Sequence, residues 1–297
     1  MVTENISDTY SWPRISIVTP SYNQGPFLEE TILSVIGSHY PNLEYIIMDG
    51  GSTDNSIEII KKYETHLAYW ASEKDSGQSD AINKGFSRAT GSIYGWLNSD
   101  DMYLPGALHY AALNMDITKP EYLFGNCFHF KENKPDSYGS DVKGWSERFD
   151  LSLRDYTIQP ASFWTQKAWV ITGGLDINLH YSMDWDWVIR AKKENVIFKP
   201  QDKYLAVYRI HENHKTSTGK DKRLKELSLV YRKHRGAGYE RIFLECCGRL
   251  STIHLIRRLI HRFRLGRYDI ELLRYFFPKL FWHSSRSEII SMLDMTK

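Results

Sequence analysis

Two aspartates, Asp100 and Asp101, stand side by side where an apolar run ends in the sequence GWLNSDDMYLPG (residues 95–106). Carboxylate oxygens at the end of a buried strand are ligands that suit Mg²⁺ or Mn²⁺, which complete their coordination with substrate phosphates and water. A structural role is the alternative, because Asp101 could cap the helix expected near Pro105. The sequence has no histidine and cysteine cluster with zinc spacing. The pair therefore favours a hard-metal site.

The first 118 residues alternate short apolar strands with helices. Strands are expected at 14–20, 43–49, 67–73 and 92–98, and helices after Gly25-Pro26, at 56–64, within 76–90 and from Pro105. This alternation predicts right-handed crossovers and a largely parallel sheet covered by helices on both faces. After Pro120 the pattern loosens: EYLFGNCFHF predicts a strand, 141–179 is irregular, and SMDWDWVIRAKKEN predicts a helix.

Polar residues follow each of the four predicted strands. They are Thr19 to Asn23, then Asp49 and Asp54, then Glu73 to Asp75, and finally Asn98 to Asp101. In a parallel sheet, ligands bind beyond the carboxyl ends of the strands. Four separate segments are therefore expected to meet at one edge of the sheet and to form a site for a polar ligand.

Composition narrows the class of protein. With 297 residues, 42% of them hydrophobic and 25% charged, the chain is expected to be globular. A net charge of +2 gives no reason to expect nucleic acid as a partner. Three cysteines, two of them adjacent, indicate a reducing, cytoplasmic compartment without a disulfide framework. We expect neither a secretion signal nor a membrane span, because no suitable apolar run occurs.

Five segments in order make the sequence resemble the family 2 glycosyltransferases with the GT-A fold. They are ISIVTPSYNQGPFLEETILSVIGSHYPNLEYIIMDGGSTDNSIEII, SEKDSGQSDAINKGFSRATGSIYGWLNSDDMYLPGAL, YTIQPASFW, GGLDINLHYSMDWDWVIRA and YRIHENHKTST. The resemblance covers residues 14 to 218, roughly two thirds of the chain. It implies an α/β fold whose mixed, mainly parallel sheet is flanked by helices, here with a helical C-terminal extension.

The resemblance also implies an activity. Members of this family move a sugar, with inversion, from a nucleotide-diphosphate sugar to an acceptor hydroxyl. For this chain we expect a UDP-sugar as the favoured donor, a saccharide or lipid-linked acceptor, and Mn²⁺ or Mg²⁺ as cofactor. Polysaccharide or glycoconjugate assembly is the expected setting.

Candidate donor-site residues come from the resemblance together with helix spacing. The nucleotide-sugar set is Thr19, Pro20, Tyr22, Asp49, Asp80, Asn83, Lys84, Asn98 and Ser99. Two departures from the family pattern stand out, because Asn98 occupies a position where Asp is usual, and Ile82 one where Arg is common. Phosphate neutralisation would then fall to another residue such as Lys84, although a lysine on a helix face is often just solvated.

The catalytic and acceptor residues also follow from the resemblance. Asp184, in the sequence MDWDW, matches the general base, with Met183 where Glu is usual, while Asp186 is expected to serve structure. The metal ligand is expected to be Asp100, joined by the late histidine His211. Acceptor contacts are expected from Gln159 and Trp185.

Charge and pattern divide the chain near residue 235. We expect a catalytic domain at 1–235, with a nucleotide-sugar half at 14–118 and an acceptor half at 119–235. The region 236–297 carries 11 basic and 6 acidic residues, against 27 and 30 before it. Within it Ile253, Ile256, Ile260 and Phe263 recur on one face of a basic amphipathic helix. Such a helix either lies on the anionic inner face of a membrane or docks on the catalytic domain or a second subunit.

Two other functions fit the same scaffold. A sugar nucleotidyltransferase shares the sheet and the metal but is expected to carry basic residues in its first phosphate loop, and TPSYNQGPF has none. A non-catalytic carbohydrate-binding protein is the second alternative. A Rossmann dehydrogenase is disfavoured, because no Gly-x-Gly-x-x-Gly follows a strand.

Overall fold

The structure is a computed structural model that describes residues 11–131, 138–140, 142–146, 150–212, 215 and 219–296. Its described residues form two compact units, the first within 1–147 and 157–214 and the second within 148–156 and 215–297. The C-terminal unit therefore begins earlier than the boundary expected at 235. The reason is that α8 (Lys220–Arg235) packs on α9 (Ala237–Cys247).

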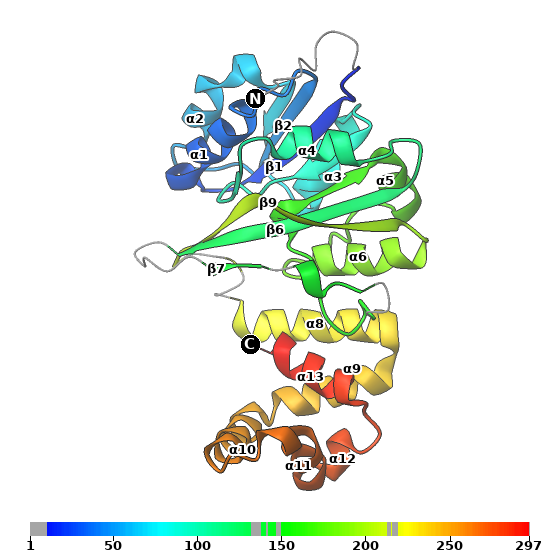
Figure 1. The fold of residues 1–297 in the computed structure, drawn as a ribbon. Coiled ribbons are helices and arrows are strands. Elements are labelled where there is room, and N and C mark those ends of the chain that lie inside the picture. The colour runs from blue at the N-terminus through cyan, green and yellow to red at the C-terminus, as the bar shows by residue number, and fades with distance from the viewer. Residues whose placement is uncertain are drawn as a thin grey trace. The chain divides into compact units, whose positions relative to one another are not determined.

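A mixed, largely parallel sheet forms the first unit, which confirms the fold predicted from the sequence (Figure 1). Its strands are β1 (Ile15–Ser21), β2 (Leu43–Asp49), β3 (Tyr69–Ser72), β4 (Ile93–Trp96), β5 (Met102–Tyr103), β6 (Glu121–Lys131), β7 (Tyr138–Gly139), β8 (Ser162–Thr165) and β9 (Ile197–Ile210). Their order is β3-β2-β1-β4-β8-β6-β9-β5, and β7 pairs with β6. The first four strands of this order run parallel, whereas β8 runs antiparallel to both of its neighbours.

Helices follow the strands as the alternation predicts. They are α1 (Gly25–Ile36), α2 (Ser56–Lys62), α3 (Gln78–Arg88), α4 (Ala107–Asn114), α5 (Gln166–Thr172) and α6 (Met183–Lys193), with the short 3-10 helices η1 (Glu64–His66), η2 (Val142–Gly144) and η3 (Gln159–Ala161). The predicted start of α1 is confirmed, since Pro26 lies in its first turn. The buried face of α1 carries Leu28, Ile32 and Val35, at the spacing of one helical face.

Every residue of β1 is buried, and its isoleucines belong to the main hydrophobic cluster. The strand is buried on both sides, as expected in a parallel sheet that is covered on both faces. Burial of the whole strand fixes the position of its C-terminal end, and therefore the start of the loop that follows.

The sequence analysis missed several elements, among them β8, α5 and β9. β8 and α5 lie inside the stretch 141–179, which was expected to be irregular. β8 has only four residues, too few for a periodic pattern, and it is held by pairing with β4 and β6. β9 was missed as well, because Pro200 and several charged residues interrupt its alternation.

The second unit is helical. It contains α8, α9, α10 (Leu250–Arg262), η4 (Gly266–Tyr268), α11 (Asp269–Phe276), α12 (Pro278–Phe281) and α13 (Arg286–Met295). Its own core gathers residues from α9 to α13, among them Cys246, Ile253, Leu273, Phe281 and Ile289. Among the described residues, no helix is both long and apolar enough to cross a lipid bilayer.

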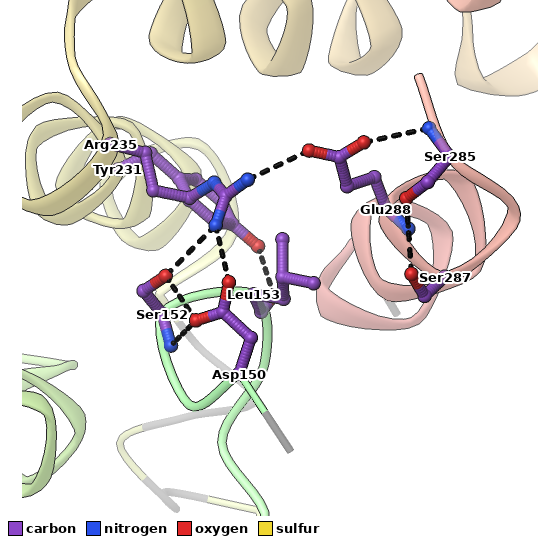
Figure 2. Close-up of polar contacts among 8 residues, drawn as sticks. All are labelled: Asp150, Ser152, Leu153, Tyr231, Arg235, Ser285, Ser287 and Glu288. Carbon is purple, nitrogen blue, oxygen red and sulfur yellow. Dashed lines mark hydrogen bonds and ion pairs between the residues drawn. The ribbon is translucent and has the colours of Figure 1, made fainter. Parts of the chain in front are cut away.

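The segment 150–156 is tied to this helical unit by Arg235 (Figure 2). The Arg235 guanidinium donates to Asp150 at 2.6 Å, to Ser152 at 3.0 Å and to Glu288 of α13 at 2.7 Å. The Tyr231 hydroxyl also donates to the Leu153 carbonyl at 2.8 Å. One arginine at the end of α8 therefore joins two segments that are distant in sequence.

We predict that Arg235→Gln loosens the C-terminal unit by about 1–2 kcal/mol, because it removes charge-assisted hydrogen bonds that are partly screened by water. Burial alone would raise the pKa of the Asp150 carboxyl, but hydrogen bonds from Ser152 and the charge of Arg235 bring that pKa below its ordinary value. The carboxylate therefore contributes stability above its unfolded pKa of about 4, and this contribution is lost as the pH falls.

Hydrogen exchange of peptides from α13 and 150–156 measures this effect. Exchange in Arg235→Gln should be faster than in the parent chain at pH 7, and the difference should shrink in acid. Arg286→Gln is the matched control, because its ion pair with Glu271 is solvent-exposed and 3.6 Å long. Equal exchange in the parent chain and Arg235→Gln at pH 7 would contradict the assignment.

Candidate functional site

The carboxyl ends of β1, β2 and β3 form one row, as the sequence predicts. Ser21 stands opposite Asp49, and Asp49 stands opposite Ser72. The buried Asp49 carboxylate accepts hydrogen bonds from the Ser52 hydroxyl at 2.5 Å, the Ser72 hydroxyl at 2.7 Å and two backbone amides of the Gly51–Ser52 turn. Asp49 thus shapes the turn after β2, and a contact with the nucleotide base remains a prediction.

One of the three residues predicted as donor contacts at the end of β1 has an exposed side chain. Thr19 and Pro20 are buried, and the Thr19 hydroxyl lies 3.1 Å from the buried hydroxyl of Tyr45. Tyr22, in contrast, is 60% exposed. Of the three residues predicted here, only Tyr22 therefore presents its side chain to solvent.

The two adjacent aspartates have different surroundings. Asp101 is 1% exposed, and its carboxylate accepts from the Arg209 amide at 3.0 Å and from the Asn98 side chain at 3.2 Å. Its carbonyl accepts from the Thr31 hydroxyl at 2.7 Å. Burial, together with the negative charge of Asp100, raises the pKa of the Asp101 carboxyl well above its usual range. Asp101 therefore anchors the loop.

Asp100 and His211, the two residues predicted as metal ligands, face each other, and a role in metal binding stays a prediction. Asp100 Oδ2 lies 3.1 Å from His211 Nε2, and the imidazole packs on the Phe27 ring. The Asp100 carbonyl accepts from Arg209, whose guanidinium also pairs with Glu30. The loop after β4 is thus joined to the end of β9 through both the carboxylate and the carbonyl of Asp100.

These two side chains fit a divalent ion that is shared with a substrate. Within the part of the chain that the structure describes, no three His, Cys, Asp or Glu side chains gather around one point. Asp100 and His211 supply one carboxylate and one imidazole. Mg²⁺ is usually held by one or two carboxylates together with substrate phosphates and water, so a site with few protein ligands is compatible with it.

Asn98 lies at the centre of a chain of side-chain amides. Its Oδ1 accepts from Gln78 at 2.7 Å, and its Nδ2 donates to Gln159 at 3.3 Å as well as to Asp101. Gln159 in turn donates to the Trp96 carbonyl at 2.7 Å. Two predicted residues, Asn98 and Gln159, are therefore in contact, and the neighbouring Ser99 is buried.

The predicted residues of α3 form ion pairs and hydrogen bonds with other parts of the protein. Lys84 lies 3.2 Å from Asp80 and 3.4 Å from Glu73. A hydrogen bond from the Ser76 amide, with help from Lys84, lowers the pKa of the Asp80 carboxyl. Asn83 makes two hydrogen bonds of 2.8 Å with the backbone of Leu175. The charge of Lys84 is thus already balanced by carboxylates.

Asp184 lies in the first turn of α6 and is partly exposed. The loop before α6 is attached to α3, since the Ser79 hydroxyl donates to the Leu179 carbonyl at 2.8 Å. The His180 ring lies against Gly77, where an added Cβ would come within 3.1 Å of it. Because Gln78 contacts Asn98, the first turn of α3 touches both the loop of Asp100 and the loop leading to Asp184.

The remaining predicted residues of α6 are buried. Asp186 is fully buried and pairs with Arg190 at 2.9 Å, and Arg190 also donates to the carbonyls of Thr172 and Gly174. This arrangement agrees with a structural role for Asp186. The Trp185 ring is only 1% exposed, so it packs in the interior, and its acceptor contact stays a prediction.

Sequence reasoning missed two residues that position the site. Gln78 was overlooked because a lone glutamine carries no chemical signature. Arg209 had a weak signal, since it lies two residues before the predicted ligand His211, but β9, the strand that ends just after Arg209, was itself not predicted.

Comparison with known proteins places this geometry in a family. The family model described as "Glycosyl transferase family 2" matches residues 16–174, more than half of the chain. An uncharacterized glycosyltransferase of Mycobacterium tuberculosis is 29% identical over 187 residues, which cover 61% of this chain and 70% of the relative. A putative teichuronic acid biosynthesis glycosyltransferase of Bacillus subtilis is 38% identical over 96 residues, 31% of this chain and 37% of the relative.

Solved structures share the fold. Staphylococcus aureus TarS in complex with UDP-GlcNAc has a TM-score of 0.59 at 18% identity, over 75% of this chain and 67% of that one. The Pyrobaculum calidifontis mannosyltransferase PcManGT, in complex with GDP-Man and Mn²⁺, has a TM-score of 0.61 at 17% identity, over 96% of this chain and 87% of that one. At these identities the likeness shows the fold alone, and the predicted GT-A fold is confirmed. With the family match, it follows that the chain belongs to glycosyl transferase family 2.

Proposed function

We propose that this transferase moves a sugar, with inversion of configuration, from a nucleotide-diphosphate sugar to an acceptor hydroxyl. The observation that carries the proposal is the first turn of α3, which contacts both the loop of Asp100 and the loop leading to Asp184. The loop that carries Asp100, the proposed metal ligand, and the loop that leads to Asp184, the proposed base, are thereby both attached to α3.

The donor is proposed to be a nucleotide sugar, with UDP favoured as the nucleotide. The complexes of TarS with UDP-GlcNAc and of PcManGT with GDP-Man support this class of donor. The row Ser21, Asp49 and Ser72 lies where such ligands bind in a parallel sheet. Tyr22 is the exposed aromatic side chain at that edge.

In the proposed reaction, the Asp184 carboxylate takes the proton of the acceptor hydroxyl as that oxygen attacks the anomeric carbon. The bond from the anomeric carbon to the phosphate oxygen breaks, and the nucleoside diphosphate leaves with the bonding electrons. A single displacement from the opposite face inverts the configuration. Gln159 is proposed to lie beside the reacting sugar through its contact with Asn98.

Mn²⁺ or Mg²⁺ is the proposed cofactor, held by Asp100 and His211. When bound, such an ion supplies Lewis-acid stabilisation of the negative charge on the diphosphate leaving group. The Mn²⁺ in the PcManGT complex supports this part of the proposal. Lys84 is a weaker candidate for that task because Asp80 and Glu73 already neutralise it.

The acceptor is proposed to be a saccharide or a lipid-linked saccharide in polysaccharide or glycoconjugate assembly. The similarity to the putative teichuronic acid biosynthesis glycosyltransferase supports this setting. The cytoplasmic side of a membrane is the proposed location, in keeping with three cysteines that are free thiols in the structure.

Replacing the proposed base should stop chemistry but not binding. Asp184→Asn is expected to lower turnover by at least about 10²-fold, because general base catalysis contributes about 10² to 10⁴. Release of nucleoside diphosphate measures turnover, and calorimetric titration with the donor measures binding. Glu194→Gln, at the exposed C-terminal end of the same helix, is the control. Turnover in Asp184→Asn equal to that of the control would exclude Asp184 as the base.

Replacing the proposed metal ligand should change the response to metal. In Asp100→Asn the Mn²⁺ concentration for half-maximal activity is expected to rise at least tenfold, because losing even an outer-shell partner costs about 10- to 100-fold in metal affinity. Chelation should abolish activity in the parent chain, and added Mn²⁺ should restore it. An unchanged Mn²⁺ response in Asp100→Asn would rule out this ligand, and full activity in chelator would rule out the cofactor.

Restoring the family's usual residue at position 98 should be harmful here. Asn98→Asp removes two donated hydrogen bonds and places a second carboxylate beside buried Asp101, so a loss of about 1–3 kcal/mol in stability is expected. Thermal unfolding measures the loss, and Asn114→Asp, which loses a single hydrogen bond to Tyr110, is the control. A variant as stable as the parent, with tighter Mn²⁺ binding, would show that the amide is not needed.

A further inference from the structure

One face of α10 is already used inside the C-terminal unit. Ile253 and Ile260 are buried in the core of that unit, and Ile256 packs partly against it. The sequence analysis grouped these isoleucines with Phe263 as one surface that either lies on a membrane or docks on protein. The structure corrects this grouping, because Phe263 is 70% exposed and the isoleucines pack within their own unit.

A second apolar stripe on α10 remains exposed. Leu255 and Leu259 are 50% and 44% exposed, and Phe263, which caps the C-terminal end of α10, follows at the same spacing of four residues. Residues at this spacing lie on one face, one turn above another. Exposed apolar side chains scattered singly are ordinary, whereas three in line beside charged residues indicate a contact surface.

The surroundings of this stripe are strongly basic. Residues 248–268 contain six arginines and no aspartate or glutamate. Arg257 is paired with Asp269 at 2.9 Å. Arg258 and Arg262 are exposed, and among the residues that the structure describes neither forms an ion pair. The guanidinium groups thus flank the stripe without local neutralisation by carboxylates.

We propose that Leu255, Leu259 and Phe263, with Arg258 and Arg262, form a surface that binds an anionic lipid bilayer. The three apolar side chains enter the interface between headgroups and acyl chains, and the arginines contact lipid phosphates. This is the geometry of an interfacial amphipathic helix with a basic polar side. The surface deepens the proposed function by naming the element that holds the enzyme where a lipid-linked acceptor lies.

The same features disfavour a second copy as the occupant. A symmetric dimer through this stripe would bring the arginines of two copies together, and 248–268 has no carboxylate to balance them. The stripe is also narrow, three side chains over two helical turns, whereas a stable protein interface buries about 800 Å² on each partner. A bilayer needs no matching side chains.

Flotation of the full chain with lipid vesicles tests the proposal. We expect binding to vesicles that contain phosphatidylglycerol, and weak binding to vesicles of phosphatidylcholine alone. Leu259→Gln with Phe263→Gln should lower the partition coefficient about tenfold or more. Arg258→Gln with Arg262→Gln should lower it about fivefold for each arginine, and high salt should act in the same direction.

The matched control is Leu244→Gln on α9, because Leu244 is 43% exposed, close to Leu259. The proposal is overturned if the parent chain does not float with anionic vesicles, or if Leu244→Gln weakens binding as much as Leu259→Gln. It is also overturned if light scattering without lipid shows a dimer that Leu259→Gln with Phe263→Gln dissolves. Circular dichroism of each variant shows that the helices are intact.

This measurement uses neither donor nor acceptor. Loss of vesicle binding in the stripe variants with full transfer to a soluble acceptor would leave both proposals standing. Vesicle binding by a chain that never releases nucleoside diphosphate would overturn the proposed function alone. The two proposals therefore fail separately.

Discussion

The site depends on one buried carboxylate. Asp101 is almost inaccessible to water, and it joins three elements, since it accepts from Arg209 of β9 and Asn98 of the loop, while its carbonyl accepts from Thr31 of α1. A buried acid is costly unless hydrogen bonds compensate it, so these partners cannot move independently. This arrangement explains the adjacent aspartates: Asp101 fixes the loop from within, and Asp100, one residue before it, is thereby held against His211.

Charge balance follows from the same constraint. Because Asp101 and Asp100 already bring two acidic groups together, a third carboxylate at position 98 would add repulsion close to a buried acid. An asparagine there keeps an acceptor for Gln78 and adds donors for Asp101 and Gln159. Asn98 in place of the family's usual Asp therefore suits its neighbours. Gln78 and Gln159 are uncharged partners for an amide, whereas a carboxylate at this position would need a cation.

What the sequence predicts well is local. β1, α1 and β2 have long, regular apolar patterns, and the polar residues after each strand meet at one edge, as β pairing requires. What it misses depends on distant partners. β8 owes its place to β4 and β6 rather than to its four residues, and the contacts of Asn83 and Lys84 need the fold to be known. The sequence could propose which residues belong to the site. Only the structure separates those whose side chains are exposed from those that hold the fold together.

The C-terminal unit shows the same limit in another form. A helical projection of α10 has apolar residues on two sides, Ile253 and Ile260 on one and Leu255 and Leu259 on the other, and periodicity alone cannot tell which side is covered. The core of the unit decides, because Leu273 and Phe281 of the neighbouring helices need the isoleucines as packing partners. Burial of that side leaves the leucines outward, on the side of Arg258 and Arg262. The core of the C-terminal unit thus accounts for the isoleucine side of α10. Among the residues that the structure describes, the exposed leucine side has no such packing partner in the unit, and it is this side that we propose to contact lipid.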